Sequence, residues 1–166
     1  MSLIDNTYLI LDANLPASDY SDLDAYIARY EKEILIKLLG YELWKLVDAY
    51  DGTPGVITDL VEGKEYTVDD ELRKWNGFIN DDKKSLIAYY VCCQWIINKH
   101  TALQTTGMMK LKSENAENAS PALKVVNAWR HMYALYYSCV DFLIENKDDY
   151  PTWVLTAIDN LNQFDI

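Results

Sequence analysis

The stretch PALKVVNAWRHMYALYYSCVDFLIENK, residues 121–147, decides the fold of this chain. It follows Ser120, and a serine before Pro121 is a strong helix start because proline is favoured at the first helical position. At 1.5 Å per residue, a helix over this range would be about 40 Å long. Asp148-Asp149-Tyr150-Pro151 then ends it. The sequence therefore predicts one long helix over residues 121–147.

Two apolar stripes follow this helix, about 100° apart around its axis. The first repeats at steps of three and four residues, which is the spacing of a helix-packing seam: Val126, Trp129, Tyr133, Tyr136, Val140, Leu143. The second lies beside it: Val125, Ala128, Met132, Leu135, Cys139, Phe142. One stripe can face the core of the chain. The other needs a second partner, which is either another helix of the same chain or another subunit.

Helical spacing also marks the first half of the chain. Residues 1–20 are expected to be extended or irregular, after which Ser21 offers an N-cap for a helix that begins at Leu23. Gly40 ends or bends this helix, and a second helical piece continues to Tyr50. The run Asp51-Gly52-Thr53-Pro54-Gly55 is a break.

The sequence in the middle of the chain predicts a short β-structure followed by further helices. Residues 56–68 are rich in β-branched residues around Glu62-Gly63, which predicts a small hairpin. Asp69 or Asp70 would then cap a short helix through Trp75. A long helix is expected over residues 81–103, capped by Asn80. Because this helix is apolar almost all round, it should be the central one.

Residues 104–120 are polar and turn-forming, which predicts a long loop. Loops of this length inside a domain are uncommon and are usually functional or mobile. Met108, Met109 and Leu111 make its middle apolar, and they pack either into the chain's own core or against a partner. Residues 151–166 are expected to form a C-terminal tail, in which 152–160 could form one last short helix.

Together these features predict a single, mostly α domain over residues 1–166. Its architecture is expected to be a bundle of about four helices, with a small β-hairpin inserted between the second and the third.

Charge and cysteine content exclude several functional classes. The net charge of −11 argues against sequence-specific nucleic-acid binding and against docking on an anionic membrane, because both need clustered Lys and Arg. No apolar run approaches the roughly 20 residues that span a bilayer. The first residues lack the basic start of a secretory signal. Cys92, Cys93 and Cys139 lie in apolar stretches, as reduced core cysteines of a cytoplasmic protein do.

No catalytic, cofactor or metal site is expected. The only histidines are His100 and His131, and neither has the Glu-x-x-His pattern of a di-iron bundle. A catalytic Cys–His pair between Cys93 or Cys139 and one of these histidines is possible in space, but buried cysteines beside solvated histidines are the favoured interpretation. No phosphate-binding glycine loop is present. We therefore do not expect an enzyme.

The aromatic content favours oligomerisation instead. Thirteen tyrosines and five tryptophans suit surfaces where one end of a side chain is buried and the other is wet, as at subunit interfaces. An aromatic core is the alternative explanation. The residues that we expect at a subunit interface come from the apolar middle of the loop and from the second stripe: Met108, Met109, Leu111, Val125, Met132, Leu135, Phe142.

The order of these elements resembles that of the small helical head–tail connector (adaptor) proteins of tailed phages and prophages. One point of likeness is the helix from Tyr26 through Leu38-Leu39-Gly40 into Leu43–Val47. Another is Asp81-Asp82 at the start of a long apolar helix. The third is the 105–120 loop leading into Val126-Asn127-Ala128-Trp129-Arg130. The likeness covers roughly residues 20–147, whereas 56–68 and the tail after Pro151 depart from the family's pattern.

The resemblance implies a structural role without catalysis. Such proteins assemble into a ring beneath the portal, extend the DNA channel and give the tail a docking surface. It implies homo-oligomers, portal and tail proteins as partners, no cofactor, and a location in the cytoplasm during assembly and then in the virion. A negative channel wall would let DNA slide. The alternative is a stand-alone helical interaction or regulatory module, dimeric through an aromatic helix face.

Overall fold

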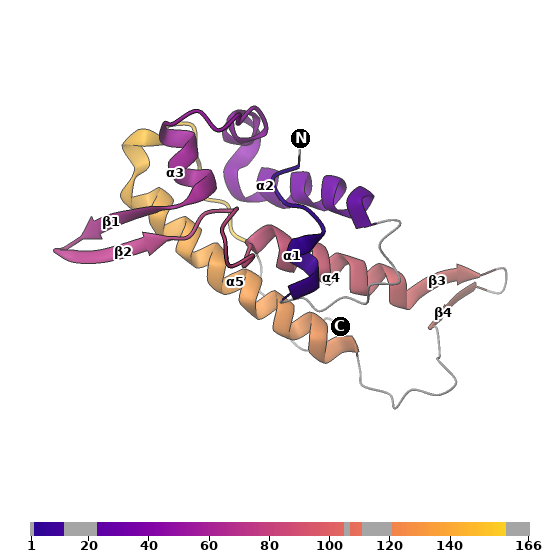
Figure 1. The fold of residues 1–166 in the computed structure, drawn as a ribbon. Coiled ribbons are helices and arrows are strands. Elements are labelled where there is room, and N and C mark those ends of the chain that lie inside the picture. The colour runs from indigo at the N-terminus through magenta and orange to yellow at the C-terminus, as the bar shows by residue number, and fades with distance from the viewer. Residues whose placement is uncertain (1, 12–22, 105–106, 111–120, 159–166) are drawn as a thin grey trace.

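The computed structural model describes residues 2–11, 23–104, 107–110 and 121–158, and side-chain positions for 2–9, 23–98 and 122–158. The described part of the chain is mostly helical, as the sequence predicts (Figure 1). The α-helices are α1 (Thr7–Leu11), α2 (Leu23–Asp48), α3 (Val56–Glu62), α4 (Leu86–His100) and α5 (Pro121–Glu145). The strands are β1 (Lys64–Val68), β2 (Glu71–Trp75), β3 (Thr101–Gln104) and β4 (Gly107–Lys110). A 3₁₀ helix, Lys147–Asp149, follows α5.

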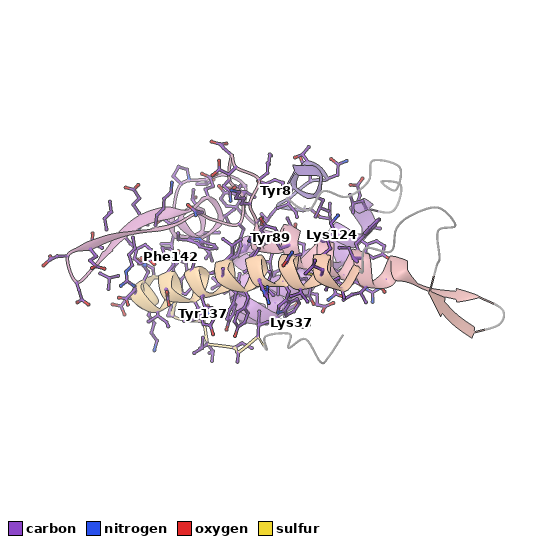
Figure 2. All side chains as sticks on the ribbon, turned by 90° about the horizontal axis from the view of Figure 1, so that it is seen from below. Tyr8, Lys37, Tyr89, Lys124, Tyr137 and Phe142 are labelled. Carbon is purple, nitrogen blue, oxygen red and sulfur yellow. The ribbon has the colours of Figure 1, made fainter. Side chains whose placement is uncertain are left out.

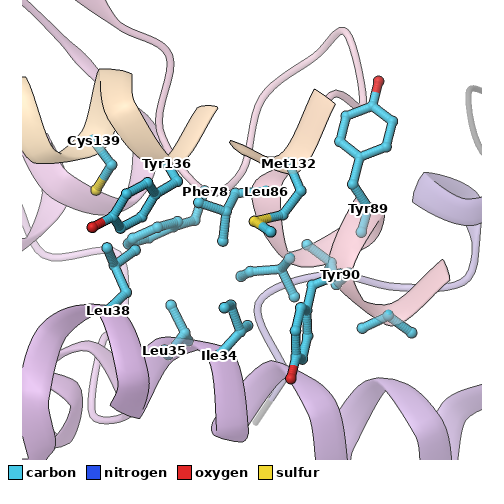
Figure 3. Packing of buried hydrophobic residues seen from close by; sticks show 14 of the residues in the cluster. Ile34, Leu35, Leu38, Phe78, Leu86, Tyr89, Tyr90, Met132, Tyr136 and Cys139 are labelled. Atoms are coloured by element: carbon cyan, nitrogen blue, oxygen red, sulfur yellow. The ribbon is translucent and has the colours of Figure 1, made fainter. Parts of the chain in front are cut away.

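Helix α4 is the centre of the core, as its apolar sequence predicts. It packs against α2 on one side and α5 on the other, and side chains from all three helices meet in one cluster (Figure 3). Val91, Cys92 and Cys93 are completely buried within it. The helix would expose this apolar surface to water if either neighbour were absent.

A kink at Gly40 divides α2 into two arms. Its backbone angles (φ 75°, ψ 164°) lie outside the helical region, in a conformation that glycine adopts at little cost. The sequence prediction of a bend at this glycine is confirmed. Trp153 donates a hydrogen bond from its indole nitrogen to the carbonyl of Leu38 (3.1 Å), two residues before the kink. The C-terminal segment therefore fastens α2 where the helix changes direction.

The hairpin between α3 and α4 is present, but it lies further along the chain than residues 56–68. Val56–Glu62 is helical, because Ile57, Leu60 and Val61 share one face and the last two are fully buried against the core. Strands β1 and β2 pair antiparallel, with Val68 opposite Glu71. The turn is made by Asp69 and Asp70, which both have positive φ. The short helix predicted through Trp75 is therefore wrong, since these residues form β2.

Both ends of α4 also differ from the prediction: the helix ends at His100, and Thr101–Gln104, expected to continue it to residue 103, form β3. The helix begins at Leu86 and not at residue 81, and the hydroxyl of Ser85 accepts the backbone N–H of Ile87 (3.3 Å) as an N-cap does. Asn80 instead holds the preceding turn. Its side chain accepts the N–H of Lys84 (3.0 Å) and donates to the carbonyl of the same residue (2.8 Å). The Asn80 side chain thus closes the turn over residues 80–84, before α4 begins.

Three further predictions need correction. Residues 7–11, expected to be extended or irregular, form α1, while 12–20 lie outside the described residues. The predicted 104–120 loop contains β4, which pairs antiparallel with β3, while 105–106 and 111–120 are not described. Residues 153–158 adopt no regular structure, so the described part of the tail forms no helix.

The molecule is elongated along α5, and the two hairpins project at its opposite ends (Figure 2). The β1–β2 hairpin lies at the end where α5 terminates, and the β3–β4 hairpin lies at the end where α5 begins. The five tryptophans are buried and distributed over the fold: Trp44 in α2, Trp75 in β2, Trp95 in α4, Trp129 in α5 and Trp153 in the C-terminal segment.

Candidate functional site

Helix α5 carries a row of exposed residues that neither apolar stripe contains. Leu123, Tyr137 and Ile144 are 66, 51 and 48% exposed, and Arg130 lies between the first two at the same seven-residue interval. Residues seven apart lie nearly one above another on a helix, so the four form a line along its outer face. We call Leu123, Arg130, Tyr137 and Ile144 the outer row. An apolar row on a long exposed helix face suits contact with another protein.

The two predicted stripes, in contrast, are largely covered within a single copy. Val125, Met132 and Phe142 are at most 3% exposed and belong to the core, so their predicted place at a subunit interface is wrong. They are buried because α5 packs its second stripe against α4 and the β1–β2 hairpin. Tyr66 and Trp75, for example, both pack on the ring of Phe142 (centroids 5.4 and 6.3 Å).

The other predicted interface residues lie elsewhere. Leu135 is half-buried and lines a groove beside the turn at Asn80. Met108 and Met109 belong to strand β4, where they pair with Leu103 and Ala102, but their side chains are not among those described. Leu111 lies outside the described residues.

Tyrosines extend the outer row sideways. Tyr133 and Tyr137 pack edge to face (4.8 Å between centroids), and their hydroxyls are 3.1 Å apart. The hydroxyl of Tyr136 donates to the carbonyl of Thr156 (2.9 Å), so the C-terminal segment passes beside this cluster. Val154 and Leu155, both more than half exposed, lie on that segment. Tyrosine is common at protein interfaces, because its ring can be buried against a partner while its hydroxyl stays in contact with water.

The β1–β2 hairpin is the second candidate surface. Side chains on both of its faces are exposed over most of its length, and Leu72 is 70% exposed. The hairpin is anchored at its base and by one side chain in the middle of β1. Trp75 is buried and donates to the carbonyl of Leu60 (2.8 Å), and the half-buried Tyr66 packs on Phe142. A two-stranded ribbon is only marginally stable by itself, so the outer part of this arm gains from a docking partner.

Two grooves are candidates for small-molecule binding. The larger, about 680 Å³, lies between α1, the end of α3 and the turn at Asn80. Tyr8 closes one side, since its hydroxyl accepts the N–H of Asn80 (3.1 Å) while Lys83 lies over its ring (4.4 Å). Its charges are mixed: Glu62, Lys74, Asp81, Asp82, Lys83, Lys84. Because these side chains carry charges of both signs, the lining does not favour one chemical class of ligand.

The smaller groove, about 360 Å³, lies between the N-terminal segment and the two arms of α2. Its polar group is Glu31, a buried carboxylate that accepts the backbone N–H groups of Leu3 (2.9 Å) and Ile4 (3.3 Å). Burial raises the pKa of Glu31 above its ordinary value, and these two hydrogen bonds partly oppose that rise. Glu31 therefore acts as a tether for the N-terminal segment.

A polar network joins α2 to α4. Glu33 accepts hydrogen bonds from Lys37 (2.7 Å) and from the hydroxyl of Tyr90 (2.7 Å). Burial and the bond to Glu33 raise the pKa of Tyr90 to about 12, so the phenol stays protonated and keeps donating. The bond to Lys37 in turn lowers the pKa of Glu33. The network suits a structural role in helix packing.

The cysteines do not provide a nucleophile. All three are completely buried, and burial raises the pKa of Cys92 to about 11 and those of Cys93 and Cys139 further. A thiol that stays protonated at neutral pH is a poor nucleophile. His131 is exposed and stacks on Tyr89 (5.2 Å), while the side chain of His100 is not described.

Among the described residues, no three His, Cys, Asp or Glu side chains lie together in a way that could hold a metal ion. Within the same part of the chain, every helix is too short or too polar to cross a bilayer.

Sequence reasoning missed the outer row and placed the hairpin too early in the chain. The seven-residue spacing of Leu123, Tyr137 and Ile144 was available as a signal, but Arg130 interrupts it and two stronger stripes share the same helix. The hairpin was misplaced because its turn, Asp69-Asp70, lacks the glycine that usually marks such turns.

Comparison with known protein families gives a match over residues 35–157 to the family model DUF6712, described as a family of unknown function. The matched range holds the second arm of α2, both hairpins, α4, α5 and Trp153. No curated protein and no solved structure matches the chain.

Proposed function

Because the chain belongs to the DUF6712 family, whose function is unknown, we propose a function from its own surface: it is a structural subunit that assembles into a ring and helps to join head and tail in a tailed phage or prophage particle. The outer row of α5 carries this proposal. Three large apolar side chains remain about half exposed or more along one line of a 25-residue helix, although the two apolar stripes of that helix are largely covered within the same copy.

The shape of the molecule and its charge support the same function. Hairpins that project from opposite ends of an elongated body can each reach a neighbouring copy in a ring (Figure 2). The net charge of −11 suits a channel through which DNA slides without adhering. In this proposal the partners are other copies of the chain, the portal and the tail proteins, and the subunit performs no catalysis.

The test is assembly in the presence of a portal protein from the same genome. Mass photometry should find small species at low concentration, and negative-stain images should show rings at high concentration or on the portal. A particle of unchanging small size across a thousandfold concentration range, with and without the portal, would contradict the proposal.

The alternative function is a stand-alone module that dimerises through α5. The charge pattern along this helix favours it, because Lys124 and Arg130 are exposed in its first half and Asp141 and Glu145 in its second. Two copies packed antiparallel would place opposite charges together. Such a dimer should give one species in light scattering that is insensitive to concentration above the micromolar range.

A further inference from the structure

The β1–β2 hairpin and the outer row carry complementary chemistry. The hairpin tip consists of Asp69, Asp70, Glu71 and the exposed Leu72. Glu71 makes a long ion pair with Arg73 (3.9 Å), and no ion pair of Asp69 or Asp70 occurs within the described residues. The tip therefore presents a concentrated negative charge beside one large apolar side chain.

The first two-thirds of the outer row present the opposite arrangement. Arg130 is exposed between Leu123 and Tyr137, and no carboxylate in the described part of the chain lies within ion-pair distance of it. Lys124, also exposed, adds positive charge one residue from Leu123. A positive centre flanked by apolar side chains complements the hairpin tip.

The dimensions of the two surfaces also agree. Leu123 and Tyr137 are fourteen residues apart, which is about 21 Å along a helix. Each hairpin strand has five residues, which corresponds to about 17 Å. The hairpin can therefore lie along the row, with Leu72 against its apolar side chains and the tip carboxylates near Arg130.

We propose that the β1–β2 hairpin of one copy docks on the outer row of α5, between Leu123 and Tyr137, of the next copy. This proposal rests on the proposed ring function and specifies its subunit contact. The hairpin and the first half of α5 lie at opposite ends of the molecule (Figures 1 and 2), so the contact runs from head to tail. Contacts of that kind repeat from copy to copy and close into a ring when the rotation permits.

Charge reversal tests the contact. Arg130→Glu reverses the charge of the row. The triple variant Asp69→Asn, Asp70→Asn, Glu71→Lys changes the charge of the tip from −3 to +1 and keeps, at the two positions with positive φ, a residue type that tolerates it. Each variant alone should raise the concentration of half-assembly about tenfold or more, because like charges then face each other. An equimolar mixture of the two should assemble again, since each reversed surface meets a complementary one on the other variant.

Matched controls carry the same charge changes outside both surfaces. Lys147→Glu is matched to Arg130→Glu, and the double variant Asp148→Lys, Asp149→Lys is matched to the tip variant. These residues lie on the exposed 3₁₀ helix, and both controls should assemble as the wild-type chain does. Glu145→Lys distinguishes hairpin docking from the alternative α5–α5 dimer. It would disrupt the antiparallel dimer and leave hairpin docking unchanged. Assembly that is lost in Glu145→Lys but kept in the tip variant would overturn the proposal.

Cross-linking supplies a direct readout. Leu72→Cys and Tyr137→Cys subunits, mixed and oxidised, should form a disulfide-linked pair between different variants that neither forms alone. Linking of Tyr137→Cys to itself, without the mixed product, would indicate α5–α5 pairing and overturn the proposal. Rings of wild-type protein without the mixed cross-link would refute this contact alone, whereas absence of rings on the portal would refute the ring function itself.

Discussion

At the scale of single residues, the contact between Gly63 and Gly77 fixes the position of the hairpin. A Cβ atom on Gly77 would lie 2.6 Å from the carbonyl oxygen of Val61, and its φ of +80° disfavours any side chain. Gly77→Ala should lower the free energy of unfolding by about 3 kcal/mol or more. Gly52→Ala is the control, because its φ is similar but its surroundings are open, and it should cost roughly 1 kcal/mol. Urea unfolding curves that coincide for the two variants would refute the packing argument.

Glu31 predicts a pH dependence. Its pKa in the folded chain is raised by burial above that in the unfolded chain, so the folded state binds the proton more tightly. The contribution of Glu31 to the unfolding free energy should therefore rise as the pH falls from 7 through the folded pKa toward the ordinary value of a glutamate. Glu31→Gln removes this group, and the difference in stability between wild-type and variant should grow in favour of wild-type between pH 7 and pH 5. Denaturation curves at both pH values measure it, and parallel pH profiles would contradict the assignment.

At the scale of elements, the C-terminal segment connects three helices. Tyr150 donates to the carbonyl of Val56 (2.8 Å) in α3, Trp153 to that of Leu38 in α2, and Thr156 accepts from Tyr136 in α5. Trp153→Phe keeps an aromatic ring but leaves the Leu38 carbonyl without its donor, so stability should fall by about 1–2 kcal/mol. Val154→Ala, at a residue 73% exposed, should change it by less than about 0.5 kcal/mol. Thermal unfolding measures both, and equal effects would contradict a role for the indole hydrogen bond.

The elements also show which parts of the structure can be predicted from sequence. Helix periodicity located α5 and all of α4, although it began α4 too early and ended it too late, and a single glycine located the kink in α2. The same reasoning placed the hairpin too early, because the β-branched residues of α3 have strand propensity while their burial at positions 57, 60 and 61 selects the helix. The outer row could not be predicted because a single sequence does not show which face of α5 is left uncovered by the rest of the chain. The assembly role itself remains a prediction.

At the scale of the whole molecule, the proposed assembly predicts a change in hydrogen exchange. In dilute subunits, the amides of β1 and β2 should exchange quickly, because most side chains of this two-stranded ribbon are exposed. In assembled rings the same amides should exchange at least about tenfold more slowly. The amides of α4 are buried in each copy and serve as the internal control, since their exchange should not change. Unaltered exchange in the hairpin at ring-forming concentrations would contradict docking of this arm.

The placement of one enclosed indole in each of α2, β2, α4, α5 and the C-terminal segment has an experimental consequence. Replacing four of the five tryptophans with phenylalanine leaves a single tryptophan, whose fluorescence reports on the element in which it lies. Five such proteins would record the melting of five regions by the same optical signal. Coincident midpoints would define one cooperative unit, whereas an early transition at position 75 would identify the hairpin as a part that loosens before the rest.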